Sequence, residues 1–272
     1  MPVLSSIFIY PVKSLAGIQV SKWQVNEKGL LHDRKWMLID SANQFLSQRR
    51  LPKMALISTQ LTETELILST ATSGSISLAL SPQQGTDIIS TIWKDQCLSK
   101  TISKEADQWL SNFLDIECKL VYQPDEVIRS VDPTYAKTSD KVNFSDGFPF
   151  LITSEASLES LNHAMDLQLP MQRFRPNLVI SQCDSYEEDT WRKVTINDIS
   201  FRLPKACSRC SVPTIDTKTA QTNKEPLTTL SRLRKWNNKV FFGQNALHDN
   251  SGILSVNSEV TINTTGPNQP PL

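Results

Sequence analysis

Short runs of alternating apolar and polar residues dominate the first 122 residues of the chain. The alternation of Ile7 and Ile9 with their neighbours, and the run from 35 to 40, each predict a short strand. The alternation from 61 to 68 on either side of Thr64 and Glu65 predicts a hairpin. Residues 118–122 return to a strand pattern, so this part of the chain is expected to be β-rich.

One stretch of this region follows a different period. Residues 103–115 carry apolar side chains at the spacing i, i+3, i+4, i+7 and i+8, namely Ala106, Trp109, Leu110, Phe113 and Leu114. This spacing places them on one face of a helix. The pattern predicts a helix that packs on a sheet.

The second half of the chain begins with a polar segment and then alternates strands with helices. Residues 123–146 are rich in Pro, Asp, Ser and Lys, which indicates a domain boundary or a long surface crossing. Ser154 is placed to cap a helix whose apolar face is Leu158, Leu161 and Met165, and Pro226 begins a second helix. Strands are predicted at 148–152, 178–180, 194–196, 199–203, 240–247 and 256–262, with a turn at Asn197-Asp198.

These patterns together predict an α+β fold that is mainly β, in two domains. We expect a β-rich N-terminal domain at 1–122 and a second β domain with a few packed helices at 123–264. Residues 265–272 have the composition of a flexible tail or a truncated linker.

Composition narrows the range of partners. Lys and Arg total 28, Asp and Glu total 28, and the formal net charge is therefore zero. No long-range field favours nucleic acid or an anionic membrane, so we expect neither as a partner, and any anion site must be local. Five cysteines, an odd number in a chain without a recognisable secretion signal, favour reduced thiols and a cytoplasmic location.

The segment from Lys205 to Asp216 concentrates candidate chemistry, because it holds Cys207 and Cys210 in a Cys-x-x-Cys spacing around Arg209. Such a pair suits half of a zinc site, a dithiol redox centre or two structural thiols. Zinc is disfavoured because a closed site needs four ligands and the three histidines, His32, His163 and His248, are scattered. A thioredoxin-like centre is disfavoured because residues 211–215 are expected to be extended rather than to open a helix.

Several cations stand at the ends of predicted strands. Arg209 lies between the two thiols, Arg34 and Arg175 flank apolar runs, and Lys13 precedes Ser14 after another apolar run. An arginine in such a position either extends its charge to solvent or holds an oxyanion. The spacing alone leaves open an anion pocket and a set of unrelated surface cations. We expect the three histidines to be structural and Cys97 and Cys118 to be core thiols.

Five segments carry a family resemblance: 9–14 (IYPVKS), 33–36 (DRKW), 150–158 (FLITSEASL), 174–177 (FRPN) and 206–210 (ACSRC). In this order they resemble the MOSC-domain molybdoenzymes, in particular the mitochondrial amidoxime-reducing components and bacterial proteins of the YcbX type. The resemblance covers about residues 3–263. It implies a MOSC-associated N-terminal domain and a MOSC β-barrel domain that together hold a molybdenum–molybdopterin cofactor. The ferredoxin-like domain that some bacterial relatives carry is not expected here, because the chain has no Cys-x4-Cys-x2-Cys spacing.

The resemblance also implies roles for individual residues. Cys210 would be the molybdenum ligand and the catalytic centre, and Cys207 would stand behind it. Gly147 and Phe148 would contribute only backbone contacts, because the mitochondrial members have a hydroxyl pair in their place, and Asn245 is a weaker candidate. The other implied cofactor contacts are Lys13, Ser14, Arg34, Arg175, Asn177, Ser208 and Arg209.

The activity implied is reduction of small N-hydroxylated substrates, such as hydroxylamine-type base analogues and amidoximes, to amine and water. Electrons would arrive from a separate donor protein, such as a ferredoxin or a flavin reductase. Two alternatives remain open. One is a carrier that passes on the cofactor or sulfur without turnover, and the other is a zinc-binding or thiol-buffering structural protein.

Overall fold

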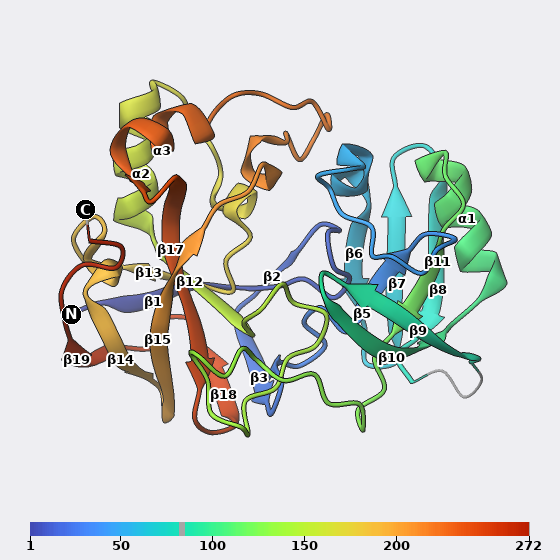
Figure 1. Cartoon of the computed structure of the whole chain (residues 1–272), viewed down its shortest axis with the longest axis horizontal. Coiled ribbons are helices and arrows are strands. Elements are labelled where there is room, and N and C mark those ends of the chain that lie inside the picture. Colours follow the sequence, from blue (N-terminus) through green and yellow to red (C-terminus); the bar gives the residue numbers. More distant parts are fainter. Residues whose placement is uncertain (82–84, 272) are drawn as a thin grey trace.

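A closed sheet forms the larger part of the molecule, which we call the barrel (Figure 1). The computed structural model describes residues 1–81 and 85–271. The strand order in this sheet is β19-β14-β15-β17-β12-β13-β1-β2, with β16 beside β17. A bridge between Val3 and Glu259 and the hydrogen bond from Val260 N to Pro2 O (2.8 Å) bring β19 back to β1. The strands are β1 (Val3–Ile9), β2 (Ile18–Val20), β12 (Phe150–Ser154), β13 (Leu178–Ser181), β14 (Trp191–Ile196), β15 (Ile199–Ser208), β16 (Lys235–Trp236), β17 (Lys239–His248) and β19 (Val260–Thr265).

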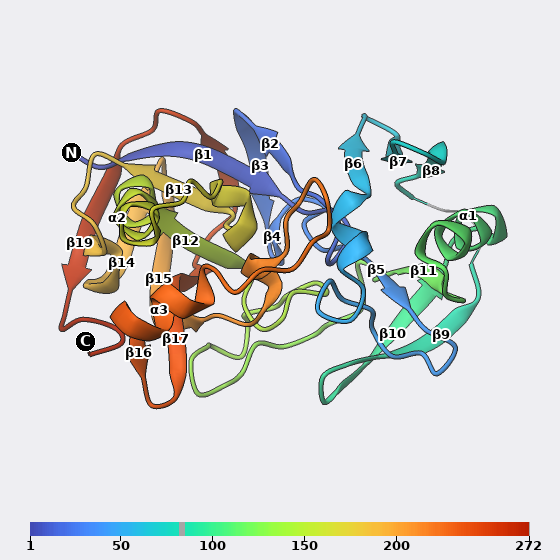
Figure 2. The same cartoon turned by 90° about the horizontal axis from the view of Figure 1, so that it is seen from above.

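Two smaller sheets and a helix form the second part, which we call the two-sheet unit; Figure 2 shows it beside the barrel from above. One sheet has the order β5-β11-β10-β9 and the other β6-β7-β8. Helix α1 (Lys104–Leu114) lies where the helical spacing predicted it, with Ser103 Oγ capping Ala106 N. The strands are β5 (Trp36–Ile39), β6 (Ser58–Leu61), β7 (Glu65–Thr70), β8 (Gly74–Ala79), β9 (Asp87–Ile92), β10 (Asp95–Thr101) and β11 (Lys119–Tyr122).

Each part has its own apolar core. The barrel core gathers inward side chains of its strands, with the rings of Phe150 and Phe201 edge to face at 5.1 Å between centroids. In the two-sheet unit, Ala106, Leu110, Phe113 and Leu114 of α1 pack on Trp36, Leu38, Leu66, Leu68 and Leu120. The prediction of an α+β, mainly β fold is confirmed.

The first strands of the chain belong to the barrel rather than to the two-sheet unit. Strand β1 pairs antiparallel with β13, and β3 (Lys22–Asn26) lies between β4 (Gly29–Leu30) and β18 (Gly252–Ser255). The chain therefore starts in the barrel, crosses to the two-sheet unit after β4, and returns through residues 123–149. The predicted domain boundary at 122/123 stays a prediction. Strands from before it, β1 and β3, pair with strands from after it, β13 and β18.

The two helices on the barrel begin where the sequence predicts them. Ser154 caps α2 (Glu155–Met165) by accepting a hydrogen bond from Ser157 N, as predicted, and Pro226 caps α3 (Leu227–Leu233). Short 3-10 turns lie at η1 (Pro52–Leu56), η2 (Met171–Phe174), η3 (Glu187–Asp189) and η4 (Val212–Thr214). Among the described residues, no helix is long and apolar enough to cross a membrane.

Three local expectations need correction. Residues 211–215 are not extended throughout: Val212–Thr214 form η4 and only Ile215 is extended, because Pro213 has a fixed φ that suits a 3-10 turn and Thr214 Oγ1 donates to Ser211 O (2.7 Å). The strand predicted at 256–262 begins only at Val260, because Asn257 turns the chain with φ 70°. The segment expected as a flexible tail is hydrogen bonded to the barrel, through Gly266 N to Thr190 O (2.8 Å) and Gln269 N to Asp189 O (2.9 Å).

Candidate functional site

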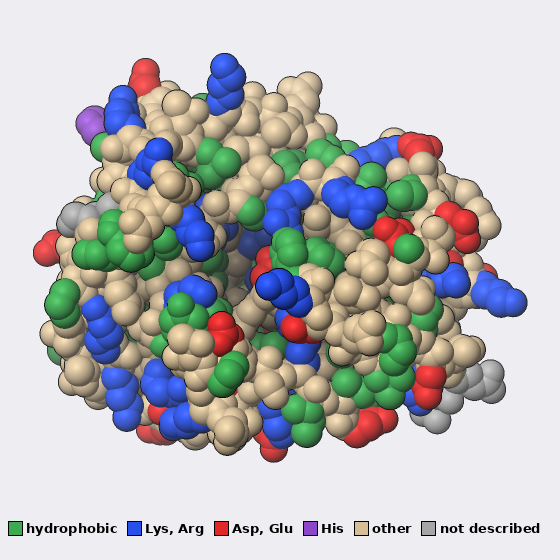
Figure 3. Space-filling model, viewed as in Figure 1, with side chains coloured by type: hydrophobic (Ala, Val, Ile, Leu, Met, Phe, Trp, Pro, Cys, Tyr) green, Lys and Arg blue, Asp and Glu red, His purple; other side chains and the backbone are tan. Residues whose placement is uncertain are grey.

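A cavity opens between the barrel and the two-sheet unit, and Figure 3 shows it as a hollow with Lys and Arg side chains around it. Five cations and one carboxylate line it, and no histidine is among its lining residues. The cations are Lys13, Arg34, Arg49, Arg175 and Arg209, and the carboxylate is Asp146. The cavity therefore suits an anion.

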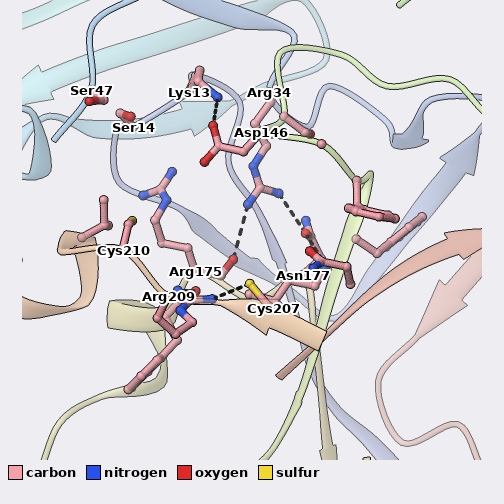
Figure 4. A pocket seen from close by; sticks show the side chains of 18 of the residues that line it. Lys13, Ser14, Arg34, Ser47, Asp146, Arg175, Asn177, Cys207, Arg209 and Cys210 are labelled. Atoms are coloured by element: carbon pink, nitrogen blue, oxygen red, sulfur yellow. Dashed lines mark hydrogen bonds and ion pairs between the residues drawn. The ribbon is translucent and has the colours of Figure 1, made fainter. Parts of the chain in front are cut away.

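The residues predicted for one site do converge here, although they come from distant parts of the chain (Figure 4). Ten of them line the cavity: Lys13, Ser14, Arg34, Gly147, Phe148, Arg175, Asn177, Arg209, Cys210 and Asn245. Ser208, in contrast, is exposed at the end of β15 and lies outside the lining. That Ser208 contacts a cofactor stays a prediction, because its side chain does not line the cavity.

Lys13 is buried beside the loop that carries Asp146. Its Nζ donates to Phe144 O (2.7 Å) and to Asp146 Oδ1 (2.5 Å). Burial lowers the pKa of Lys13, although the charge of Asp146 opposes this shift. Burial would raise the pKa of Asp146, but the charge and hydrogen bond of Lys13 outweigh it and hold that pKa well below its usual range. Asp146 is therefore ionised at neutral pH.

Arg34 joins the two parts of the molecule. Its Nη1 donates to Asn177 Oδ1 (2.9 Å) and to Asp33 Oδ2 (2.5 Å), and its Nη2 donates to Arg175 O (3.3 Å). Asp33 is buried and also accepts from Tyr10 N (2.8 Å). These bonds fix the guanidinium of Arg34 on the end of β13.

Arg175 has no carboxylate partner among the described residues. Its Nη1 donates to Leu15 O (2.6 Å), and its guanidinium lies 4.2 Å from the ring centroid of Tyr10, which Arg34 also contacts at 4.4 Å. Burial lowers the pKa of Arg175 to about 10, so the group stays charged at neutral pH. Burial also raises the pKa of Tyr10 to about 12, against the two guanidinium charges. Because Tyr10 stays neutral, it does not cancel the charges of Arg34 and Arg175, which can therefore attract an anionic ligand.

The backbone is unusual at two of these cations and at Ser14, next to Lys13. Ser14, Arg34 and Arg175 have φ values of 68°, 49° and 57°, in the left-handed region that residues other than glycine seldom adopt. Each such residue costs on the order of 1 kcal/mol, and such residues gather at functional sites. Arg34 N to Tyr10 O (2.7 Å) and Arg175 N to Gln172 O (3.1 Å) hold two of them in place.

Both thiols are half-buried and both line the cavity, so the structure does not place Cys207 behind Cys210; the two differ in their contacts. Arg209 Nη1 donates to Cys207 Sγ (3.1 Å) and its Nη2 to Phe174 O (2.7 Å), whereas its buried Nε has no hydrogen-bond partner. Cys210 is half-buried in the cavity wall, at the turn into η4. Arg173 Nε donates to Pro213 O (2.8 Å), so η2 holds the segment that follows Cys210.

Several lining residues were missed by sequence reasoning. Phe45, Ser47 and Arg49 follow β5 in a polar stretch, and no pattern there marks a site. Asp146 ends the polar segment 123–146, whose composition indicates a boundary or surface crossing rather than a site. Trp93, at the β9–β10 turn, reaches this loop by donating from Nε1 to Asp146 Oδ1 (3.2 Å). Only the fold brings these side chains together.

The remaining candidates lie elsewhere. Cys97 and Cys118 are buried core thiols, as predicted. His32 lies beside Trp36, and burial lowers its pKa to about 4, while His248 bonds Asn26 O (2.6 Å) through Nε2. Over the described residues, no group of three or more His, Cys, Asp or Glu side chains is arranged to hold a metal ion.

Comparison with known families matches both halves of the chain. The family described as "MOSC N-terminal beta barrel domain" matches residues 1–117, and the family "MOSC domain" matches residues 139–261. Mitochondrial amidoxime-reducing component 1 of Mus musculus is 33% identical, over 94% of this chain and 81% of its own length. The human protein of that name is 30% identical, over 94% and 82%. Molybdenum cofactor sulfurase of Danio rerio is 32% identical over 94% of this chain, which spans only 34% of that relative.

Proposed function

Because this chain belongs to the MOSC family, with a MOSC N-terminal domain followed by a MOSC domain, we propose that it is a molybdenum-cofactor-dependent reductase of N-hydroxylated substrates. Its relatives include proteins named amidoxime-reducing components and molybdenum cofactor sulfurases. The observation that carries the proposal is the convergence of five cations and the thiol of Cys210 on one cavity that holds a single carboxylate.

The side chains present fit the anionic cofactor. Arg175 has no carboxylate partner among the described residues, and the buried Nε of Arg209 lacks an acceptor, so both can donate to a phosphate. Charge-assisted hydrogen bonds of this kind contribute roughly 1.5–3 kcal/mol each when screened from water. The thiol of Cys210 is a soft ligand, which suits a molybdenum centre better than an imidazole or carboxylate does.

The residues proposed to hold the cofactor are those that line this cavity. Cys210 would bind the metal and is the residue proposed to be catalytic. Lys13, Ser14, Arg34, Arg175, Asn177 and Arg209 would hold the pterin phosphate and ring system, with Gly147, Phe148 and Asn245 at the edge. When bound, the molybdenum–pterin group supplies two-electron oxygen-transfer chemistry.

The side chains of the cavity would orient the cofactor and the substrate rather than transfer protons. Tyr10, with a pKa raised to about 12 chiefly by burial, and the ionised Asp146 are poor proton donors at neutral pH. In the proposed reaction the N–O bond breaks and the oxygen leaves as water. The two electrons come from a separate electron-transfer protein and the protons from solvent at the open cavity. We propose cytoplasmic reducing conditions for this exchange, since all five cysteines are free thiols.

Cys210→Ser tests the proposal. Protein made in cells that synthesise the molybdenum cofactor should contain one molybdenum per chain and should reduce benzamidoxime with a chemical reductant. The variant should lose turnover, while its melting temperature changes by less than about 3 °C, because a half-buried thiol contributes little to packing. Cys183→Ser, a half-buried thiol outside the cavity lining, is the matched control and should stay active. A fully active Cys210→Ser variant would remove that residue from its role.

A second candidate function is a carrier of the cofactor or of sulfur. The similarity to molybdenum cofactor sulfurases and the second thiol, Cys207, beside Arg209 favour it. A redox titration separates the two functions. Molybdenum that cycles with a reductant supports the enzyme, whereas cofactor that passes readily to an apo-acceptor supports the carrier.

A further inference from the structure

Two cation–aromatic stacks flank the cavity, one from each part of the molecule. In the two-sheet unit, the guanidinium of Arg49 lies 4.3 Å from the ring centroid of Trp93, and the ring of Phe45 packs on the same indole at 4.9 Å. In the barrel, Lys205 Nζ lies 4.2 Å from the ring centroid of Tyr135 and 6.0 Å from that of Phe148. Phe45, Arg49 and Phe148 belong to the cavity lining, so both stacks border the space where a substrate would enter.

Both cations of these stacks lack a carboxylate partner among the described residues. The ion pairs of the chain include Arg50 with Asp40 and Lys13 with Asp146, but none that involves Arg49 or Lys205. Asp146, the one carboxylate in the lining, is neutralised by Lys13. Asp146 and Asp132 lie near enough to Arg49 and Lys205, respectively, for each cation to lower the pKa of its neighbour, but neither forms an ion pair with it. Since Lys13 already pairs with Asp146, the entrance carries an excess of positive charge.

The first stack is anchored at a tight turn. Trp93 has φ 56°, a left-handed conformation that is uncommon for a bulky aromatic residue. It stands at the two-residue turn between β9 and β10, and its Nε1 donates to Asp146 Oδ1 (3.2 Å). Trp93 is nevertheless 47% exposed. The two-residue turn accounts for the left-handed φ, and the hydrogen bond to Asp146 keeps the exposed indole beside the cavity.

The rings do not form a cage for a cationic ligand, because a cation of the protein already covers a face of each. A flat, uncharged group meets no charge repulsion there and can contact the exposed edges of the rings. The stacks thus favour planar, neutral ligands over positively charged ones.

Resting on the proposed function, we infer that Arg49 and Lys205 determine specificity by admitting uncharged N-hydroxylated substrates and repelling their protonated products. The oxygen on nitrogen withdraws electrons, so an amidoxime is neutral near pH 7, whereas the amidine formed from it is a strong base and carries a proton. The balance is one amidoxime, two electrons from the donor protein and three protons, giving one amidinium ion and one water. The ligand gains one positive charge as it is reduced, and the two rim cations then weaken its binding.

The test compares binding of benzamidoxime and benzamidine to the molybdenum-loaded protein, measured by calorimetry without an electron donor. Arg49→Gln and Lys205→Gln should each tighten benzamidine binding about threefold, as expected for one exposed charge, and the double variant about tenfold. Benzamidoxime binding should change less than twofold. Arg49→Lys should restore the wild-type preference, and high salt should remove the differences.

Arg50→Gln is the matched control, because it removes the same charge from the neighbouring residue, which pairs with Asp40 outside the cavity lining. It should leave both affinities unchanged. The inference is overturned if benzamidine binds equally to wild type and both rim variants, if benzamidoxime changes as much as benzamidine, or if neither ligand binds. It is also overturned if Arg49→Gln loses its molybdenum, since Arg49 would then hold the cofactor. Charge-dependent binding without any turnover would leave the rim inference standing and refute the proposed reductase.

Discussion

Replacing Asn177 with alanine tests whether one buried amide joins the barrel to the cation cluster. Asn177 is 1% exposed. Its Oδ1 accepts from Arg34 Nη1 (2.9 Å) and from Leu151 N (3.3 Å), and its Nδ2 donates to Phe8 O (3.2 Å). The substitution leaves a guanidinium, a buried N–H and a buried carbonyl without these partners. Each loss costs about 1–2 kcal/mol, and since the three share one side chain we expect about 3–5 kcal/mol in total.

Urea unfolding followed by far-UV circular dichroism measures the loss in free energy of unfolding. A thermal scan should show the melting temperature falling by roughly 10 °C for a chain of this size. Asn143→Ala provides a graded control. Asn143 is also buried, but its side chain makes one hydrogen bond, from Nδ2 to Asp33 O (2.8 Å), so about 1–2 kcal/mol should be lost. If Asn177→Ala is no less stable than Asn143→Ala, the amide does not join the two parts in the way its contacts indicate.

Two further predictions concern stability away from the cavity. Burial and the neighbouring Asp189 raise the pKa of Glu188 from 4.5 to about 7, so the unfolded chain binds fewer protons in that window and the free energy of unfolding falls as pH rises through it. Urea titrations should find Glu188→Gln more stable than wild type by about 1–3 kcal/mol at pH 8 and equally stable near pH 4, and equal stability at both pH values would contradict this. Gly243 has φ 78°, and a Cβ there would lie 2.7 Å from Thr153 Cγ2 and 2.8 Å from Ile152 O, so Gly243→Ala should lower the free energy of unfolding by about 2–4 kcal/mol. Gly147→Ala, whose Cβ would meet nothing within 4 Å, should leave that free energy nearly unchanged.

Elements with a strong local signal could be predicted from the sequence. Helix α1 has both an apolar stripe of period 3.6 and a serine cap, and the β14–β15 hairpin has the turn residues Asn197 and Asp198 between two alternating runs. Strands β9 and β10 had no such signal. Their outward face carries Ile89 and Leu98 opposite each other and exposed, so burial does not follow the usual alternation.

The candidate site was found through motifs rather than through physical pattern. Its residue types are visible in the sequence, but their convergence depends on contacts such as Arg175 with Leu15, which are 160 positions apart. Arg49 and Trp93 carry no motif, and their place beside the cavity follows from how the β9–β10 turn meets the loop of Asp146. A contact between such distant segments does not change the pattern of apolar and polar residues in either segment, so the sequence alone does not reveal it.

The left-handed residues explain why neither part of the molecule can build this cavity alone. Ser14, Arg34 and Arg175 hold conformations that a free peptide would leave, and some of the contacts that keep Arg34 and Arg175 in place cross the cleft. Arg34 is fixed by Asn177 of the barrel and by the backbone of Arg175, while Arg175 is fixed by Leu15 on the opposite strand end. Two half-buried guanidinium groups so close together would repel each other and separate if either part were loosened. The interface between the two parts therefore does more than join domains, since it holds positive charge in the arrangement that an anionic cofactor requires.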